Sequence, residues 1–465
     1  MPLILGTNSI KDTGFDVANS LRFNSGSNQF FEKVMGTPTS TKIGTFSCWV
    51  KLGNITTEQT MLGAYADSNN RHHIEFQADH NIEIFGKASG STNMELITNA
   101  YYRDPSAWQN IVVAYDTSQG TASNRVKLYV NGTQVTSFAT ETYPSQDTVL
   151  QFNTNGSTHT VGRNKGGNYA DGYMCEVVFI DGQQLTPTSF GEFDSDSPTI
   201  WKPIDVSGLT GGNIGFYLDF EDGSNLGNDV FGGTDFDETN ITSTNQSTDT
   251  CTLNMTTANP LHFNATIPSA GTLSDGNLTF TSSQGSSAYP AMYSTMAVSQ
   301  GKWYAEFKVT TGNSAIVGIG AGSLRGGFFG GGYYDYAYYY DGTFYNNGGN
   351  TGSQSSYTDG DIISVAMDLD NNKVYVAKNN TWQHSGNPSA GSGGYTITAP
   401  SSTNTGVYHF AYGDAGGGTP AIQGNFGSPP YSSNGNSDAN DYGNMTYSVP
   451  TGFFILNSKN LAEYG

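Results

Sequence analysis

Short runs of alternating apolar residues, separated by clusters of Gly, Asn, Asp and Ser, recur along most of the 465-residue chain. Alternation with a period of two places the apolar side chains on one face of a β-strand. The clearest runs are residues 44–52, 61–66, 71–76, 82–85, 108–116, 125–130 and 173–181, and later 277–282, 302–310, 315–320, 362–369 and 373–378. No stretch has the apolar spacing of a long amphipathic helix. The sequence therefore predicts an all-β protein.

Turn residues between these runs indicate how the strands are connected. Asn131-Gly132 is the strongest hairpin signal, because both central positions of a type I′ turn need a positive φ, and Asp181-Gly182 is a second. Regularly spaced short strands with such turns are typical of β-sandwiches. The length of the chain allows two or three domains, each with its own core.

Charge excludes two classes of partner. Lys and Arg number 19 and Asp and Glu 40, which gives a net charge of −21 at pH 7. Such a surface repels nucleic acid and anionic lipid. The first residues lack the pattern of a signal peptide, and the chain has no apolar run of about 18 residues, so we expect synthesis in the cytoplasm and no membrane insertion. Three cysteines at no metal-like spacing predict reduced, buried thiols.

Four motifs in the first half of the chain occur in a recognisable order. They are WQNIVVAYD at 108–116, KLYVNG at 127–132, VGR at 161–163 and DGYMCEVVFIDGQQL at 171–185. Residues 20–189 resemble the laminin G or pentraxin-like branch of the concanavalin A-like lectin fold. This resemblance implies a two-sheet jelly roll that recognises carbohydrate or protein, often with calcium and usually without catalysis.

A second set of motifs resembles the SPRY module. It comprises GKWYAEFK at 301–308, VGIG at 317–320, DGDIISVAMDLDNNKVYVAKNNTW at 359–382 and NFG at 425–427. The resemblance implies a second β-sandwich over residues 263–449 that binds protein or glycan through its loops and has no active site. A Gly/Tyr-rich insert at 326–345 departs from the SPRY pattern, as does Asn380, where a Gly is usual.

Between the two modules, residues 190–262 are acidic and rich in Thr and Asn, which predicts an extended connector. Its phrases FGEF at 190–193, IWKPIDVSGL at 200–209 and FYLDFEDGSNLGND at 216–229 resemble a linker in structural proteins of tailed bacteriophages, especially marine ones. The opening LILGTNSIKDTGFDVANSLRF at 3–23 belongs to the same resemblance. We expect the N-terminal segment 1–19 and the C-terminal tail 450–465 to anchor the protein to a virus particle.

The Gly/Tyr-rich insert is the candidate binding surface, because Tyr offers rigid amphipathic contact area that stacks on sugars. The candidate contact residues are Tyr333, Tyr334, Tyr336, Tyr338, Tyr339 and Tyr340. An equally weighted alternative is that residues 338–345 form a sandwich strand with a turn at Asp341-Gly342.

Calcium is the one cofactor that the sequence suggests, because an acid-rich loop offers oxygen ligands. The candidate ligands are Asp219, Glu221, Asp222 and Asp229, although turn residues of an acidic protein also form such clusters. His72 and His73 are adjacent in a strand, so they point to opposite faces and cannot share a metal.

The row Glu192–Asp196 is the nearest approach to a catalytic motif. It superficially resembles the carboxylate row of laminarinase-type enzymes, whose paired carboxylates act as nucleophile and acid. Its place next to Pro198, after the last lectin strand, favours a solvated acidic turn, so we predict no catalytic residues.

Together these resemblances predict a non-enzymatic phage virion protein, a tail fibre or capsid-decorating appendage that binds host surface glycan and aids attachment. Its expected partners are other virion proteins, host glycan and further copies of itself. A purely structural decoration without sugar binding is the alternative, and a polysaccharide depolymerase is a third.

Overall fold

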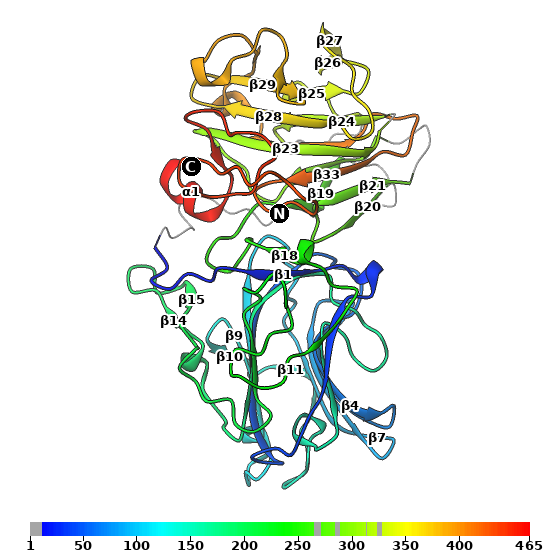
Figure 1. Cartoon of the computed structure of the whole chain (residues 1–465), viewed down its shortest axis with the longest axis vertical. Coiled ribbons are helices and arrows are strands. Elements are labelled where there is room, and N and C mark those ends of the chain that lie inside the picture. The colour runs from blue at the N-terminus through cyan, green and yellow to red at the C-terminus, as the bar shows by residue number, and fades with distance from the viewer. Residues whose placement is uncertain (1–11, 265–270, 284–288, 313, 323–327) are drawn as a thin grey trace. The chain divides into compact units, whose positions relative to one another are not determined.

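The computed structural model describes residues 12–264, 271–283, 289–312, 314–322 and 328–465 (Figure 1). The chain divides into two compact units, residues 13–252 and residues 253–465. Each unit is a β-sandwich of two large sheets, so the predicted all-β class with two sandwiches is confirmed. The twelve runs predicted as strands all form strands, and Asn131 and Gly132 both have positive φ at their hairpin.

The first sandwich, residues 13–252, is built from two eight-stranded sheets. The β3 sheet contains, in order, β10 (Thr133–Gln134), β9 (Val126–Val130), β8 (Gln109–Asp116), β3 (Ile43–Leu52), β13 (Gly172–Asp181), β1 (Ser20–Phe23) and β18 (Gln246–Ser247), with β16 (Phe216–Leu218) also paired to β13. The β5 sheet contains β11 (Phe138–Thr142), β7 (Ser91–Thr98), β6 (Ile82–Ala88), β5 (Asn70–Phe76), β4 (Gln59–Asp67), β12 (Thr158–Val161), β2 (Phe30–Val34) and β17 (Asp237–Thr239). A separate hairpin joins β14 (Gly191–Phe193) to β15 (Trp201–Pro203).

The core of the first sandwich lies between the inner faces of its two sheets. Phe46, Val113 and Phe179 of the β3 sheet and Ile74 and Ile84 of the β5 sheet belong to one buried cluster. In β5 and β6 the inward residues alternate with polar ones, so the other face of the β5 sheet carries charged side chains.

The prediction of an extended connector is wrong for residues 190–252, which belong to the first sandwich. Strands β16, β17 and β18 pair with β13, β2 and β1. The physical reason is that the β3 sheet is apolar on both faces. Val178 and Ile180 point away from the main core and are buried against Val206 and Tyr217 of the supposed connector. A strand that is buried on both faces reads as a continuous apolar run rather than an alternating one.

The N-terminal segment is also tied to the first sandwich where it is described. Val17 is buried beside Trp49, Trp108 and Trp201, and its amide donates a hydrogen bond to Thr252 Oγ1 at 3.0 Å. The predicted anchor 1–19 otherwise falls largely on residues 1–11, outside the described part of the chain.

The second sandwich, residues 253–465, has a seven-stranded and a nine-stranded sheet. The first contains β19 (Ala258–Asn264), β22 (Ala291–Ser294), β32 (His409–Asp414), β24 (Ala315–Gly320), β25 (Asp335–Tyr339), β26 (Thr343–Asn346) and β27 (Gly349–Ser353). The second contains β20 (Gly271–Ser274), β21 (Thr279–Ser282), β33 (Ala421–Asn425), β23 (Lys302–Thr311), β28 (Ile362–Asp368), β29 (Lys373–Lys378) and β30 (Thr381–Trp382), with β31 (Tyr395–Thr396) paired to β29 and β34 (Phe454–Ile455) to β23.

The C-terminal tail 450–465 is not a free segment. Strand β34 runs parallel to β23, and helix α1 (Ser458–Tyr464) follows it. Leu456 and Leu461 are 1% exposed in the main core of the second sandwich. The tail is therefore part of the second sandwich, and its role in anchoring the protein to a particle stays a prediction. Within the described residues, no helix is long and apolar enough to cross a membrane.

Candidate functional site

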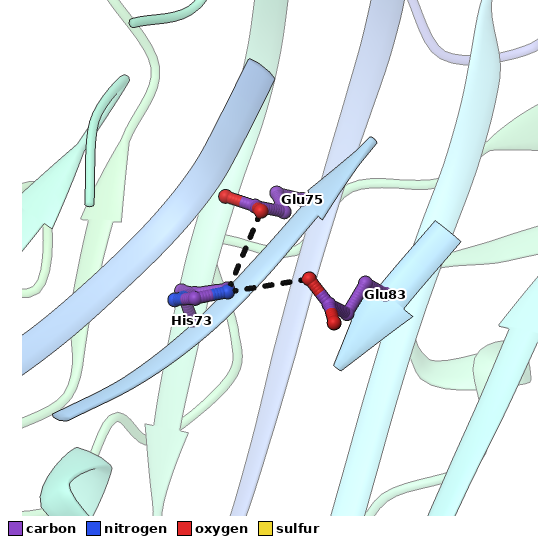
Figure 2. Close-up of side chains that lie close together, drawn as sticks. All are labelled: His73, Glu75 and Glu83. Carbon is purple, nitrogen blue, oxygen red and sulfur yellow. Dashed lines mark ion pairs between the residues drawn. The ribbon is translucent and has the colours of Figure 1, made fainter. Parts of the chain in front are cut away.

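The most distinctive polar group of the first sandwich lies on the outer face of the β5 sheet. His73 and Glu75 are two residues apart on β5, and Glu83 lies directly opposite Glu75 on β6. Ile74 and Ile84 alternate with them and point into the core, which turns the three polar side chains to the other face. Figure 2 shows the three side chains pointing toward one another from the two strands.

The imidazole of His73 lies between the two carboxylates. Its Nε2 atom is 3.5 Å from Glu75 Oε1 and 3.5 Å from Glu83 Oε2. All three residues are buried, with exposed fractions of 5%, 3% and 7% for His73, Glu75 and Glu83. The ring of His73 stacks on Phe85 at 4.9 Å, and neither of its nitrogens has a hydrogen-bond partner among the described residues.

Neighbouring side chains hold Glu75 in place. Its Oε2 accepts hydrogen bonds from Thr60 Oγ1 at 2.9 Å and from Asn164 Nδ2 at 2.7 Å. Asn168 Nδ2 lies 3.3 Å from the same oxygen. Burial raises the pKa of Glu75, and the nearby His73 opposes that shift. The second carboxylate oxygen, Oε1, lies 3.5 Å from His73 Nε2 and accepts a long hydrogen bond, 3.4 Å, from Asn168 Nδ2.

A loop at residues 162–170 covers this part of the sheet closely. At Gly63 of β4 an added Cβ would lie 2.6 Å from the carbonyl oxygen of Arg163, so a side chain there would collide with the loop. The same loop supplies the two asparagines that reach Glu75. The glycine thus allows the loop to close over the sheet and to bury the three polar residues.

Among the described residues, His73, Glu75 and Glu83 form the one group of three or more potential metal ligands whose atoms lie within 4.8 Å of one another. His72 and His73 lie on opposite faces of the sheet, as predicted, because His72 packs against Phe152 in the core. The two carboxylates beside His73 were not predicted. The signal was present, since alternation places Glu75 beside His73 and the short turn after β5 sets Glu83 opposite Glu75.

Among the described residues, the predicted calcium ligands form no group of three or more whose ligand atoms lie within 4.8 Å of one another, which corrects that prediction. The carboxylate of Asp229 is occupied by Lys33 Nζ at 3.2 Å and by the amides of Tyr217 and Phe231. Asp219 and Asp222 each accept the amide of the residue two positions later, in Asx turns. Asp219 and Glu221 have raised pKa values because of burial. The close spacing of these acidic residues therefore reflects the formation of turns in an acidic segment and not a metal site.

The predicted tyrosine surface is also corrected in part. Tyr336, Tyr338 and Tyr339 lie in β25 with exposed fractions of 5%, 0% and 8%, because both faces of this strand are covered. Tyr334 and Tyr340 are half-buried against the core, whereas Tyr333 is 70% exposed. The alternative of a strand pair is confirmed by β25 and β26, with Gly342 at positive φ between them.

The acidic row at 192–196 lies on the β14–β15 hairpin. Lys202 Nζ lies 3.5 Å from Glu192 and 3.3 Å from Asp194. The amide of Ser197 donates to Asp194 Oδ1 at 2.8 Å, and this bond is the largest cause of the lowered pKa of Asp194. Residues 192–196 therefore belong to a turn in which Glu192 and Asp194 pair with Lys202.

Comparison with known proteins identifies the class of the first module. Residues 24–189 match the family model described as the concanavalin A-like lectin/glucanases superfamily. This stretch is therefore a concanavalin A-like lectin or laminin G domain, as its motifs predicted. No curated protein matches the chain in sequence.

Solved structures similar to parts of the chain share little sequence with it. The SPRY domain of human HERC1 has 15% identity, covering 36% of this chain and 96% of its own, with a TM-score of 0.28. The native heptameric SAP-like pentraxin from Limulus polyphemus has 13% identity over 37% of this chain and 80% of its own, with a TM-score of 0.28. Stonustoxin has 17% identity over 37% and 27%, also with a TM-score of 0.28.

Proposed function

We propose that this protein is a non-enzymatic surface protein of a bacteriophage virion that binds a glycan on the host cell. The concanavalin A-like lectin domain at residues 24–189 supports the glycan-binding part of the proposal without locating the sugar contact, because this superfamily is named for lectins and glucanases. The virion part is supported by the phage-like phrases at 3–23 and 190–229. On this proposal the protein is a tail-fibre or capsid-decorating component, and its other partners are virion proteins and further copies of itself.

The chemistry of the acidic hairpin supports a role without catalysis. A glycosidase needs one carboxyl group that keeps its proton and a second that is ionised, both beside the scissile bond. Asp194 does not suit the role of the group that keeps its proton, because backbone amides and Lys202 stabilise its ionised form. Glu192 shares the same lysine and is exposed.

Tyr333 is the tyrosine of the Tyr-rich insert that remains available to a ligand. Its backbone is fixed by a hydrogen bond from Asn346 Nδ2 to its carbonyl oxygen at 3.0 Å, while its ring is 70% exposed. A fixed backbone with an exposed ring suits stacking on a sugar, because little conformational freedom is lost on binding.

We therefore expect Tyr333→Ala to weaken glycan binding about tenfold, the effect of roughly 1.4 kcal/mol of lost stacking. Tyr101→Ala is the comparison variant for the lectin domain, because Tyr101 is a similarly exposed tyrosine of that domain, at 64%. Affinity is measured by isothermal titration against the best glycan ligand. Loss of binding in Tyr101→Ala with full binding in Tyr333→Ala would move the sugar contact to the lectin domain and contradict the role of Tyr333.

A further inference from the structure

His73 is buried, yet its ring nitrogens lack hydrogen-bond partners among the described residues. Its side chain is 7% exposed, and neither ring nitrogen donates or accepts a hydrogen bond within the part of the chain that the structure describes. Buried polar groups in proteins nearly always have a partner, and each exception calls for an explanation, such as an ion that occupies the site. The Nε2 atom points between two carboxylates, which are themselves costly to bury without a compensating positive charge.

Two distances within the group are longer than those of a hydrogen-bonded ion pair and are compatible with a metal site. A protonated imidazole that bonds a carboxylate approaches it to about 2.7–2.9 Å. Here Nε2 stands 3.5 Å from both Glu75 Oε1 and Glu83 Oε2. Two ligand atoms that each lie about 2.1 Å from a tetrahedral metal are roughly 3.4 Å apart. The observed spacing therefore fits ligands that share an ion.

The surroundings of Glu75 supply the outer hydrogen bonds that metal ligands require. Thr60 and Asn164 both donate to Oε2, which fixes the carboxylate, while Oε1 lies 3.5 Å from His73 Nε2 and accepts a long hydrogen bond, 3.4 Å, from Asn168 Nδ2. Such second-shell bonds orient a ligating carboxylate and are typical of metal sites. Two carboxylates and a neutral imidazole carry a charge of −2, which a divalent cation cancels.

We propose that His73 Nε2, Glu75 Oε1 and Glu83 Oε2 bind one zinc ion on the outer face of the β5 sheet. A set of one imidazole and two carboxylates suits zinc, whereas calcium prefers six to eight oxygen ligands. A water molecule completes the tetrahedron. The ion joins β5 to β6 and, through Asn164, holds the 162–170 loop against the sheet. This site is independent of the proposed sugar contact at Tyr333.

The test uses the full-length protein, stripped with a chelator and titrated with zinc against a chromogenic zinc indicator. We expect one zinc per chain, and at least a 100-fold weaker affinity in Glu83→Gln and in His73→Gln. Glu58→Gln is the matched control, because Glu58 accepts a hydrogen bond from Asn168 beside the site but is exposed and outside the ligand group. It should bind zinc within twofold of the wild type.

Circular dichroism of the metal-free variants establishes that they remain folded. Zinc X-ray absorption of the wild type then identifies the ligand atoms around the ion without the use of any variant. Scattering from one imidazole and only oxygen or nitrogen neighbours supports the assignment. The proposal is overturned by sulfur in the coordination shell, by folded variants that bind zinc as the wild type does, by no zinc binding in the micromolar range, or by calcium bound in preference to zinc.

Discussion

Asp249→Ala should destabilise the first sandwich by about 3–5 kcal/mol, the range measured when one partner of a buried ion pair is removed. Lys51 Nζ lies 2.8 Å from Asp249 Oδ2, and the two side chains are 1% and 2% exposed. Trp108 Nε1 donates to the other carboxylate oxygen at 3.2 Å. Without the carboxylate, the ammonium of Lys51 stays buried beside Tyr173 with its main counter-charge lost.

The matched control is the double variant Lys51→Met with Asp249→Leu, which removes both charges and keeps an apolar volume. Replacing a whole buried pair in this way is often neutral or stabilising, so the double variant should recover most of the lost stability. Hydrogen exchange of β3 peptides in increasing urea measures the first sandwich separately, with β23 peptides as the internal reference. An Asp249→Ala protein whose β3 peptides are as protected as in the wild type would contradict the role given to residues 190–252.

Glu176→Gln should stabilise the first sandwich at pH 8 by about 4 kcal/mol while changing little at pH 4. Burial raises the pKa of Glu176 from its usual 4.5 to about 8. Its Oε2 accepts a hydrogen bond from Tyr217 Oη at 2.9 Å, and the nearby Asp219 and Glu221 disfavour the ionised form further.

The direction of the effect on stability depends on whether the folded or the unfolded chain holds the proton of Glu176 more tightly. Below pH 4.5 Glu176 is protonated in both the folded and the unfolded chain. Between about pH 4.5 and 8 the unfolded chain loses this proton first, so the stability that it contributes is lost progressively, at about 1.4 kcal/mol per pH unit. A glutamine keeps the hydrogen bond to Tyr217 and never ionises, so it removes this loss.

Urea unfolding at pH 4, 6 and 8, followed by hydrogen exchange of β13 peptides, measures the effect. Glu192→Gln is the control, because Glu192 is exposed on the β14–β15 hairpin. If the stability difference between Glu176→Gln and the wild type does not change between pH 4 and pH 8, the pKa of Glu176 is not raised in the folded protein.

The sequence allowed the strands to be predicted because most of them obey simple local rules. The runs at 44–52, 302–310 and 373–378 correspond to β3, β23 and β29, with bounds within one residue. The hairpin at Asn131-Gly132 was predictable because its backbone demands positive φ at both positions. Asn380 also adopts positive φ, which explains how it stands where the SPRY pattern usually has Gly.

Features that depend on distant contacts were not predictable in the same way. The composition of residues 190–252 predicts a connector, because polar turns make up most of this segment. Only a few apolar residues, such as Val206 and Tyr217, cover the β3 sheet. The tyrosines of β25 were candidates for a binding surface, because composition does not reveal that this strand is covered on both faces. The group of His73, Glu75 and Glu83 needed the register between two strands, which the sequence only implies through turn length.

Glycan binding is the central claim, and binding of the full-length protein to an array of bacterial surface glycans and to intact host cells tests it most directly. The measurement is made with divalent cations present and again after chelation. We predict saturable binding that free sugar competes away. Absence of binding under both conditions would contradict the claim and favour a structural decoration of the virion that contacts only other virion proteins.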